Sequence, residues 1–223
     1  MMRVSPTILA AGAALLVPQA AQAAQLEPLA PCYRSVDERT RETVPVRASG
    51  FTPGEHVNVY IDGVVAQQDV VVLTDGRVTG GVPAPFIAKG ERPFTLTVTE
   101  VEQPSNTVSA MSRVTALSLR LKPRRAAPDR RVRVIGSGFT DGTDVYAHYV
   151  RKRKLRKTVR LGAPQGPCGR IDVKRRQIPL RKPALGRWTL QVDNQKAYSA
   201  QPNGVRVLLP ITVTKNPRRV FRD

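Results

Sequence analysis

The chain has 223 residues, with 36 Lys and Arg against 17 Asp and Glu, a formal net charge of +19, and 41% hydrophobic residues. This apolar content is enough for a packed core and argues against a fully disordered chain. No run of 18 or more apolar residues occurs, so no spanning helix is expected. Nineteen Pro and sixteen Gly argue against long helices, and two Cys exclude both a cysteine-only zinc site and a cysteine-dense scaffold.

The N-terminal segment, residues 1–23, has the pattern of a signal peptide. Arg3 supplies a positive start, residues 8–17 form a short apolar stretch, and Ala21-Gln22-Ala23 fits a small-x-small cleavage site. A buried N-terminal helix is the alternative interpretation. The signal peptide predicts a secreted mature chain that begins near residue 24. At the other end, residues 216–223 are expected to form a frayed basic tail.

The mature sequence contains an internal duplication. Residues 44–51 read VPVRASGF and residues 132–139 read VRVIGSGF, an offset of 88. Two later blocks repeat in the same order, namely GRV at 76–78 with GRI at 169–171, and FTLTV at 94–98 with WTLQV at 188–192. A period this long is typical of a duplicated domain rather than a solenoid. We expect one domain over residues 24–113 and a second over residues 114–215.

Both units have the sequence pattern of β-strands. Apolar and polar residues alternate over 44–49, 56–61 and 94–99, which places one face of each strand on a core and the other in water. Turn signals recur every 8–15 residues. Short strands at this spacing predict antiparallel sandwiches. The expected fold class is therefore all-β, with two tandem β-sandwiches in which Phe94 and Trp188 are core residues.

The segments ASGFTPGEHVNVYIDG (48–63) and GSGFTDGTDVYAHYV (136–150) resemble the glycine–phenylalanine corner of bacterial immunoglobulin-like modules. The IPT/TIG-like repeats of secreted actinobacterial proteins are the nearest group, and the resemblance covers most of the mature chain in two copies. It implies immunoglobulin-like domains with a role in adhesion, spacing or display, and no shared chemistry. Gly50 and Gly138 are expected to permit a bend between strands.

The two units differ sharply in charge. Residues 24–113 carry eight Lys and Arg against eleven Asp and Glu, whereas residues 114–223 carry 27 against six. The second unit is also about five residues longer after its tyrosine-bearing strand, where a basic hairpin is expected. The predicted polyanion-binding residues are Arg151, Lys152, Arg153, Lys154, Arg156, Lys157, Lys174, Arg175 and Arg176. Further basic clusters lie at 130–131 and 181–182.

Clustered like charges repel one another, and an anionic polymer would relieve this repulsion and release counterions. The sequence therefore predicts a secreted, non-catalytic protein that contacts anionic envelope polymers or acidic glycans through its second domain. Sequence-specific DNA recognition is not expected, because no recognition helix is present. Two alternatives remain: basicity that serves only solubility, and a structural or display module that recognises a protein partner through its sheet edges.

Cys32 and Cys168 lie one in each unit. Lone thiols in an oxidising compartment commonly pair, so an intramolecular disulfide is favoured over an intermolecular bridge or two free thiols. Tyr146 and Tyr149 could stack on sugars or bases, although at least one of them is expected to pack in the core.

No catalytic motif occurs, so no enzyme activity and no cofactor are expected. His56 and His148 are interpreted as surface strand residues. The spacing of Asp62, Asp69 and Asp75 matches no calcium loop; they are interpreted as solvated turn acids, and no metal site is expected.

Overall fold

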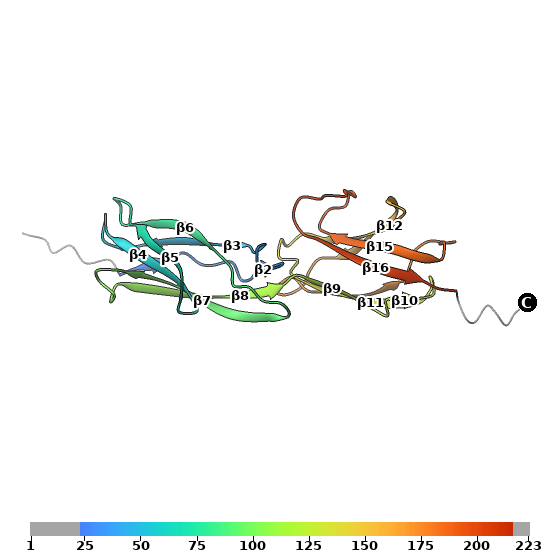
Figure 1. The fold of residues 1–223 in the computed structure, drawn as a ribbon, viewed down its shortest axis with the longest axis horizontal. Coiled ribbons are helices and arrows are strands. Elements are labelled where there is room, and N and C mark those ends of the chain that lie inside the picture. The colour runs from blue at the N-terminus through green and yellow to red at the C-terminus, as the bar shows by residue number, and fades with distance from the viewer. Residues whose placement is uncertain (1–22, 216–223) are drawn as a thin grey trace, which may run out of the picture.

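The computed structural model describes residues 23–215, and its regular elements are sixteen strands in four sheets. The expected signal peptide up to residue 22 and the tail at 216–223 lie outside the described residues. No helix in the described part of the chain is long and apolar enough to cross a membrane. The strands form two sandwiches that lie end to end along the long axis of the molecule (Figure 1).

The first domain comprises β1 to β8. Its three-stranded sheet has the order β1-β3-β6 and its five-stranded sheet the order β2-β8-β7-β4-β5. The bounds are β1 (Gln25–Leu26), β2 (Tyr33–Ser35), β3 (Thr43–Ser49), β4 (His56–Ile61), β5 (Val64–Val71), β6 (Val78–Pro83), β7 (Glu91–Glu100) and β8 (Thr107–Ala116).

The second domain comprises β9 to β16, with sheets of order β14-β11-β9 and β10-β16-β15-β12-β13. The bounds are β9 (Ser118–Lys122), β10 (Arg125–Ala126), β11 (Arg131–Ser137), β12 (Val145–Arg151), β13 (Lys154–Gly162), β14 (Ile171–Arg176), β15 (Gly186–Asp193) and β16 (Arg206–Val213).

The two domains share one topology. Each strand of the first domain has a counterpart eight strands later, including a short strand that pairs in parallel with the last strand of its domain, β2 with β8 and β10 with β16. All other named strand pairs are antiparallel. The predicted all-β fold with two tandem immunoglobulin-like sandwiches is confirmed.

Each sandwich has its own hydrophobic core, built from the inward positions of the alternating strands. Phe94 and Trp188 are both buried in these cores, as expected. Gly50 and Gly138 occupy equivalent corners with φ of 86° and 87°, a conformation that residues with a Cβ atom rarely adopt. The duplicated corner therefore has the same backbone conformation in both domains.

The junction between the domains is short and well bonded. Leu117 alone separates β8 from β9, and the boundary expected between 113 and 114 lies within β8. A disulfide joins Cys32 to Cys168 across the junction, which confirms the predicted pairing. The largely buried Arg34 lies 2.7 Å from the Glu42 carboxylate and 3.5 Å from Asp141 in the second domain. These contacts hold the two sandwiches in one orientation.

Candidate functional site

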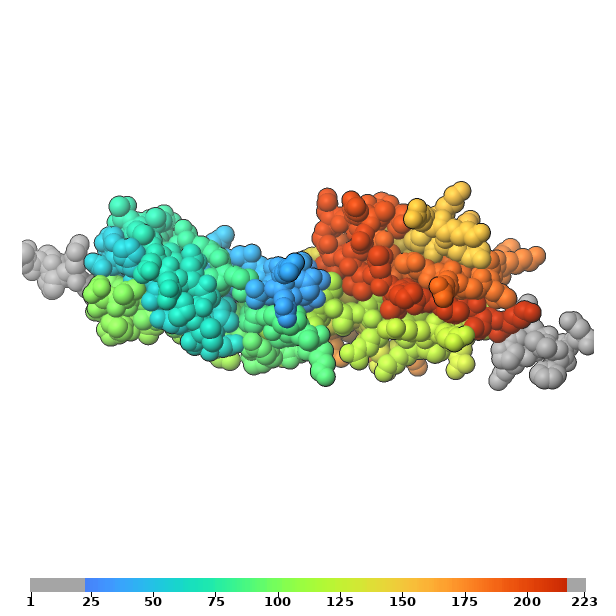
Figure 2. All heavy atoms as spheres, viewed as in Figure 1, coloured from blue at the N-terminus to red at the C-terminus, as the bar shows by residue number. Residues whose placement is uncertain are grey.

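Three basic segments of the second domain, at the start of β11, the end of β14 and the β12–β13 hairpin, lie toward the end away from the first domain. β9 starts next to the junction and ends at Lys122, so its antiparallel neighbour β11 starts at the far end. β14 ends at the same far end, because Arg176 pairs with Arg131. The hairpin between β12 and β13 also turns there, and Figure 2 shows it (gold) projecting from the outer half of the domain.

The hairpin is longer than its counterpart in the first domain. Val57 pairs with Val70 in the first domain and Val145 pairs with Gly162 in the second, so the offset rises from 88 to 92 across the turn. Four of the five additional residues therefore lengthen this hairpin by two residues per strand. The side chains of residues 152–157 are exposed. Arg151 is half-buried, lies 5.8 Å over the Trp188 ring and donates a hydrogen bond to the Leu185 carbonyl.

The hairpin turn has an unusual composition. Lys152 and Arg153 have φ of 49° and 61°, whereas the equivalent turn of the first domain uses Asp62 and Gly63 at 51° and 78°. Two-residue turns of this kind favour Asn-Gly or Asp-Gly, because other residues are strained at positive φ. Long cations occupy these strained positions, and backbone strain of this kind is more typical of a functional site than of a neutral surface.

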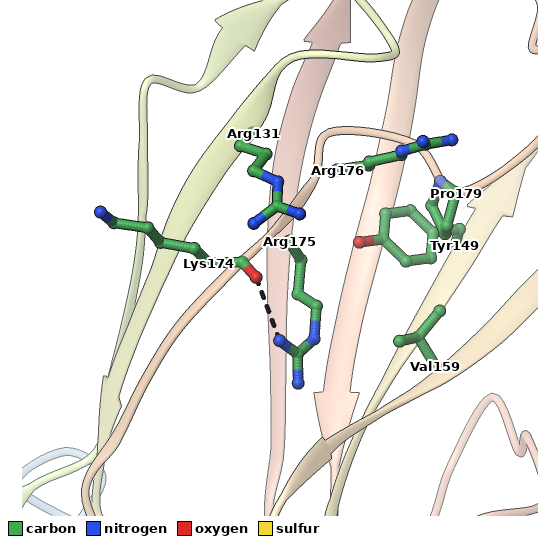
Figure 3. Close-up of a pocket in the computed structure, with 7 residues that line it drawn as sticks. All are labelled: Arg131, Tyr149, Val159, Lys174, Arg175, Arg176 and Pro179. Carbon is green, nitrogen blue, oxygen red and sulfur yellow. Dashed lines mark hydrogen bonds between the residues drawn. The ribbon is translucent and has the colours of Figure 1, made fainter.

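A slot of about 290 Å³ opens between β13 and β14, the neighbouring edges of the two sheets (Figure 3). Arg175 spans the slot by donating a hydrogen bond of 3.3 Å to the Leu161 carbonyl. Burial raises the pKa of Tyr149 to about 12, and the nearby positive charge of Arg175 only partly offsets this rise. The residues that line the slot are Arg131, Tyr149, Val159, Lys174, Arg175, Arg176 and Pro179.

The outer face of the three-stranded sheet is a flat basic surface, which we call the basic face. Its strand positions are set by the register, in which Arg131 lies opposite Arg176, while Arg133 lies between Lys174 and Lys122. Like charges directly opposite each other destabilise a sheet. The basic face consists of the exposed residues Arg120, Lys122, Arg131, Arg133, Lys174 and Arg176.

The equivalent face of the first domain is almost uncharged. There the register pairs Thr43 with Pro83, Pro45 with Gly81, and Arg47 with Thr79, so a single cation occupies these six positions, whose counterparts in β11 and β14 carry four cations and Asp172. The two sheets share their topology and their buried residues but not the charge of this outer face. The cations of the basic face are therefore not a requirement of the fold.

Few acidic residues neutralise this end of the domain. Among the described residues of the second domain, Asp141 and Asp144 lie near the junction and Asp193 is fully buried. Asp172 forms a two-point ion pair with Arg133, and the guanidinium lowers the pKa of its carboxyl group. One acidic residue, Asp129, remains close to the basic end.

The predicted residues are thus placed in two groups on one side of the sandwich. Residues 151–157 form the hairpin at the β13 edge, and residues 174–176 lie in the adjacent β14 edge strand across the slot. The sequence interpretation missed Arg120, Lys122 and Arg133. The detectable signal was a cation at every second position in three short segments, 120–122, 131–133 and 174–176, which places them on one face of a sheet.

The interpretation of His148 as a surface residue is wrong. Its side chain is fully buried and makes hydrogen bonds to Thr158, Asp193 and the Gln195 carbonyl. His56 is exposed, as expected. Tyr149 packs in the core, as expected for at least one of the two tyrosines.

Two of the three acids interpreted as turn residues have local partners, whereas Asp69 is exposed within strand β5, so its assignment to a turn is wrong. Asp62 pairs with Arg92, and Asp75 pairs with Arg77. Within residues 23–215, no group of three or more His, Cys, Asp or Glu side chains is placed to hold a metal ion.

No family model and no curated protein matches this sequence. Similar solved structures include the fibronectin(III)-like modules of Clostridium thermocellum CbhA, with 10% identity, a TM-score of 0.25, and coverage of 85% of this chain and 93% of that one. Bovine butyrophilin has 10% identity and a TM-score of 0.30, with coverage of 85% and 96%. SGBP-B of the Bacteroides ovatus mixed-linkage glucan utilization locus, solved in complex with a mixed-linkage heptasaccharide, has 14% identity and a TM-score of 0.24, with coverage of 86% and 48%.

Proposed function

We propose that this chain is a secreted, non-catalytic tandem immunoglobulin-like protein whose second domain binds anionic polymers at or outside the cell envelope. The observation that carries the proposal is the contrast between equivalent sheets. Six facing positions of β11 and β14 carry four cations and Asp172, whereas the six equivalent positions of β3 and β6 carry one cation; β9 adds Arg120 and Lys122 to the same face. A surface that only aids solubility does not require cations stacked on neighbouring strands, where they repel.

The arrangement fits a long anion better than a small one. The basic face and the hairpin border the same edge of the sandwich, with the arginine-lined slot between them. A polymer lying across this edge contacts cations on both sides and releases its counterions, which supplies affinity without a deep cavity. Arginine suits such a site, because its planar guanidinium binds carboxylate and phosphate groups with two hydrogen bonds.

The proposed secretion rests on the disulfide, and the proposed absence of catalysis rests on a cluster of buried polar side chains. A disulfide between domains is typical of proteins outside the reducing cytosol. Thr158, His148 and Asp193 form a hydroxyl–imidazole–carboxylate chain, but the imidazole and the carboxylate are fully buried, so substrate has no access to them. We also propose kinship with the IPT/TIG-like tandem modules, on the strength of the duplicated glycine–phenylalanine corner.

Binding to heparin, single-stranded DNA and a teichoic-type polymer tests the proposal. The logarithm of the affinity should fall steeply and linearly with the logarithm of salt concentration, with each phosphate contact on a single strand contributing a slope of about 0.7. The hairpin variant Lys152→Gln/Arg153→Gln/Lys154→Gln and the face variant Arg120→Gln/Arg131→Gln/Lys174→Gln should each weaken binding at low salt and flatten the slope.

The matched control removes the same charge from the first domain, with Arg39→Gln/Arg47→Gln/Lys89→Gln. All three residues are exposed, and the control should retain the slope and affinity of the wild-type protein. An equal effect of all three variants would show that net charge alone drives binding. Unchanged binding by both second-domain variants would refute the proposal.

A protein partner is a second candidate function, supported by the edge strand β5. β5 pairs only with β4, and its exposed apolar side chains include Val64 at 70% and Val71 at 56% exposure. Exposed apolar edge strands can accept a strand from another chain. A partner captured from the native envelope in high salt, and lost in the variant Val64→Lys/Val71→Lys, would favour this function. The equivalent edge β13 carries Lys and Arg instead, which discourages strand addition.

A further inference from the structure

The connection between β15 and β16 is longer than its counterpart in the first domain. It comprises residues 194–205, whereas residues 101–106 connect β7 to β8. In the first domain the outer face of the five-stranded sheet carries cross-strand pairs of hydroxyl side chains, such as Thr97 with Ser109, that are open to solvent. In the second domain His148, Gln191 and Asp193, on the same face of β12 and β15, are buried beneath the longer connection.

Buried polar side chains hold this connection in place. Burial on its own would raise the pKa of Asp193, but hydrogen bonds from His148, Gln191 and the Gln195 backbone amide outweigh it, and the pKa is lowered. Gln191 also donates a hydrogen bond of 2.7 Å to the Ser199 carbonyl. Each of these polar side chains has a hydrogen-bond partner, so the connection is an ordered part of the domain that packs on the sheet.

The connection and the basic hairpin border a groove of about 610 Å³ on the outer face of β12, β15 and β16. Figure 2 shows the connection (red) and the hairpin (gold) standing side by side along one border of the second domain. The floor is uncharged and includes Thr189, Gln191 and the half-exposed Leu208. Tyr198 of the connection also lines the groove.

Cations lie at both ends of the groove. Arg187 and the hairpin residues 151–153 occupy the end away from the first domain, and Arg206 occupies the other end. Arg187 is six positions along β15 from Asp193, the partner of Arg206 in the register, which corresponds to about 20 Å along a strand. The groove therefore matches an elongated ligand with acidic groups spaced along it and a weakly polar surface between them.

The strands of the floor restrict which ligand can bind. β16 pairs with β10 only at Thr212 and Val213, but β12 and β15, the central strands of the floor, have a neighbouring strand on both sides, so their backbone groups are already paired. An extended peptide cannot add to them as a further strand, which is the usual way a sheet gains affinity for a peptide backbone. A sugar chain needs no strand edge, since its ring faces pack on Tyr198 and Leu208 while its hydroxyl groups bond to Thr189 and its carboxylates to arginine.

We propose that this groove binds a short segment of an acidic glycan, with uronate carboxylates on Arg187 and Arg206 and sugar rings on Tyr198 and Leu208. The proposal deepens the proposed function and rests on it for the class of ligand. It assigns the groove a chemical preference for sugars, whereas the basic face selects for charge alone. The added connection of the second domain is the element that creates this preference.

Titration calorimetry with a hyaluronan hexasaccharide tests the proposal. Arg187→Gln and Leu208→Ser should each weaken binding about tenfold, the equivalent of one charge-assisted contact or one packed side chain. The face variant Arg120→Gln/Arg131→Gln/Lys174→Gln should retain hexasaccharide binding while it weakens binding to long polymers. Met111→Ser is the matched control for Leu208→Ser, because Met111 is exposed on the corresponding outer face of the first domain.

Two probes of different chemistry complete the experiment. A neutral chitin hexasaccharide and a hexaglutamate peptide should both bind at least tenfold more weakly than the hyaluronan hexasaccharide, a difference of about 1.4 kcal/mol. Equal binding of hexaglutamate, or hexasaccharide binding unaltered by Arg187→Gln and Leu208→Ser, would overturn the glycan groove while the proposed polymer binding stands. Failure of the face and hairpin variants to alter long-polymer binding would overturn the proposed function instead.

Discussion

At the scale of single residues, the turn of the basic hairpin combines a conformational cost with a concentration of charge. Lys152 and Arg153 hold positive φ angles that the first domain assigns to Asp62 and Gly63. A left-handed conformation costs a residue with a Cβ atom about 1 kcal/mol relative to glycine. The two turns have the same length and lie at equivalent places in the fold, so the first domain provides a natural reference for the second.

We therefore expect Arg153→Gly to stabilise the second domain by about 1 kcal/mol, because glycine removes the left-handed strain. Combining it with Lys152→Asp gives the turn sequence of the first domain. The double variant should be more stable than wild type to urea but weaker in binding heparin, since two cations are lost. Gly63→Arg in the first domain is the reverse control and should destabilise that domain by a similar amount. A loss of stability in Arg153→Gly would show that the turn is not strained.

The buried carboxylate of Asp193 predicts a dependence on acid pH. Its pKa is lowered in the folded protein, because hydrogen bonds to the ionised form outweigh its burial. A lowered pKa stabilises the folded state above the unfolded value of 3.8, and this contribution is lost as pH falls through the folded pKa. His148 on β12 is the basic side chain bonded to this carboxylate, while Arg206, its register partner on β16, donates instead to the Ala200 carbonyl.

Urea unfolding followed by Trp188 fluorescence between pH 6 and pH 2 measures this contribution. Wild-type protein should lose stability on acidification faster than the variant Asp193→Asn, which has no proton to gain at this position. Asp144→Asn serves as a control for an exposed carboxylate whose pKa is lowered by Arg160. Parallel pH profiles for wild type and Asp193→Asn would contradict the assignment of this acid sensitivity to the buried cluster.

At the scale of the elements, the basic face should make the second domain sensitive to salt. Arg131 and Arg176 are opposite each other, as are Arg133 and Lys174, and such pairs repel at the short cross-strand distance. Salt screens exposed charges. Raising the salt concentration should therefore stabilise the second domain while it weakens polymer binding, a combination that a neutral sheet would not show.

The variant Arg131→Thr/Lys174→Thr tests this prediction, because it removes one member of each repelling pair. In low salt it should be more stable than wild type by up to about 1 kcal/mol, and its stability should increase less on addition of salt. Denaturation monitored at several salt concentrations gives both quantities. A salt response identical to that of wild type would show that the repulsion is already relieved within the sheet.

The strands and loops also show which features of the fold can be predicted from sequence patterns. Strict alternation and a repeated block predicted the sandwiches, because strand faces and turns are local properties. The offset change near the tyrosine-bearing strand located the longer hairpin. The same alternation, applied to Arg131 and Arg133, could have predicted the basic face. The burial of His148 had no local signal, since it depends on the connection at 194–205 folding back across a sheet.

At the scale of the whole molecule, the domains differ in charge but are held together as one extended body. Three features lie at the junction: the disulfide, the one-residue linker Leu117, and the contacts of Arg34 with Glu42 and Asp141. The basic end is at the opposite end of the second domain. The first domain therefore lies away from the basic surface, as expected of a spacer that sets the position of its neighbour.

The disulfide should account for a large part of the stability of this body. Cys32 and Cys168 are 136 residues apart in sequence, and a bond that closes so long a loop is expected to stabilise the folded state by about 4–5 kcal/mol, mainly through the unfolded chain. The variant Cys32→Ser/Cys168→Ser should therefore lose up to this amount in urea unfolding, and reduced wild-type protein should behave like it. Arg34→Gln, which removes polar contacts at the same junction, should cost less. If the double serine variant stays within about 1 kcal/mol of the oxidised protein, the bond restrains the unfolded chain far less than its loop length predicts, and the large stabilising role of the disulfide is disproved.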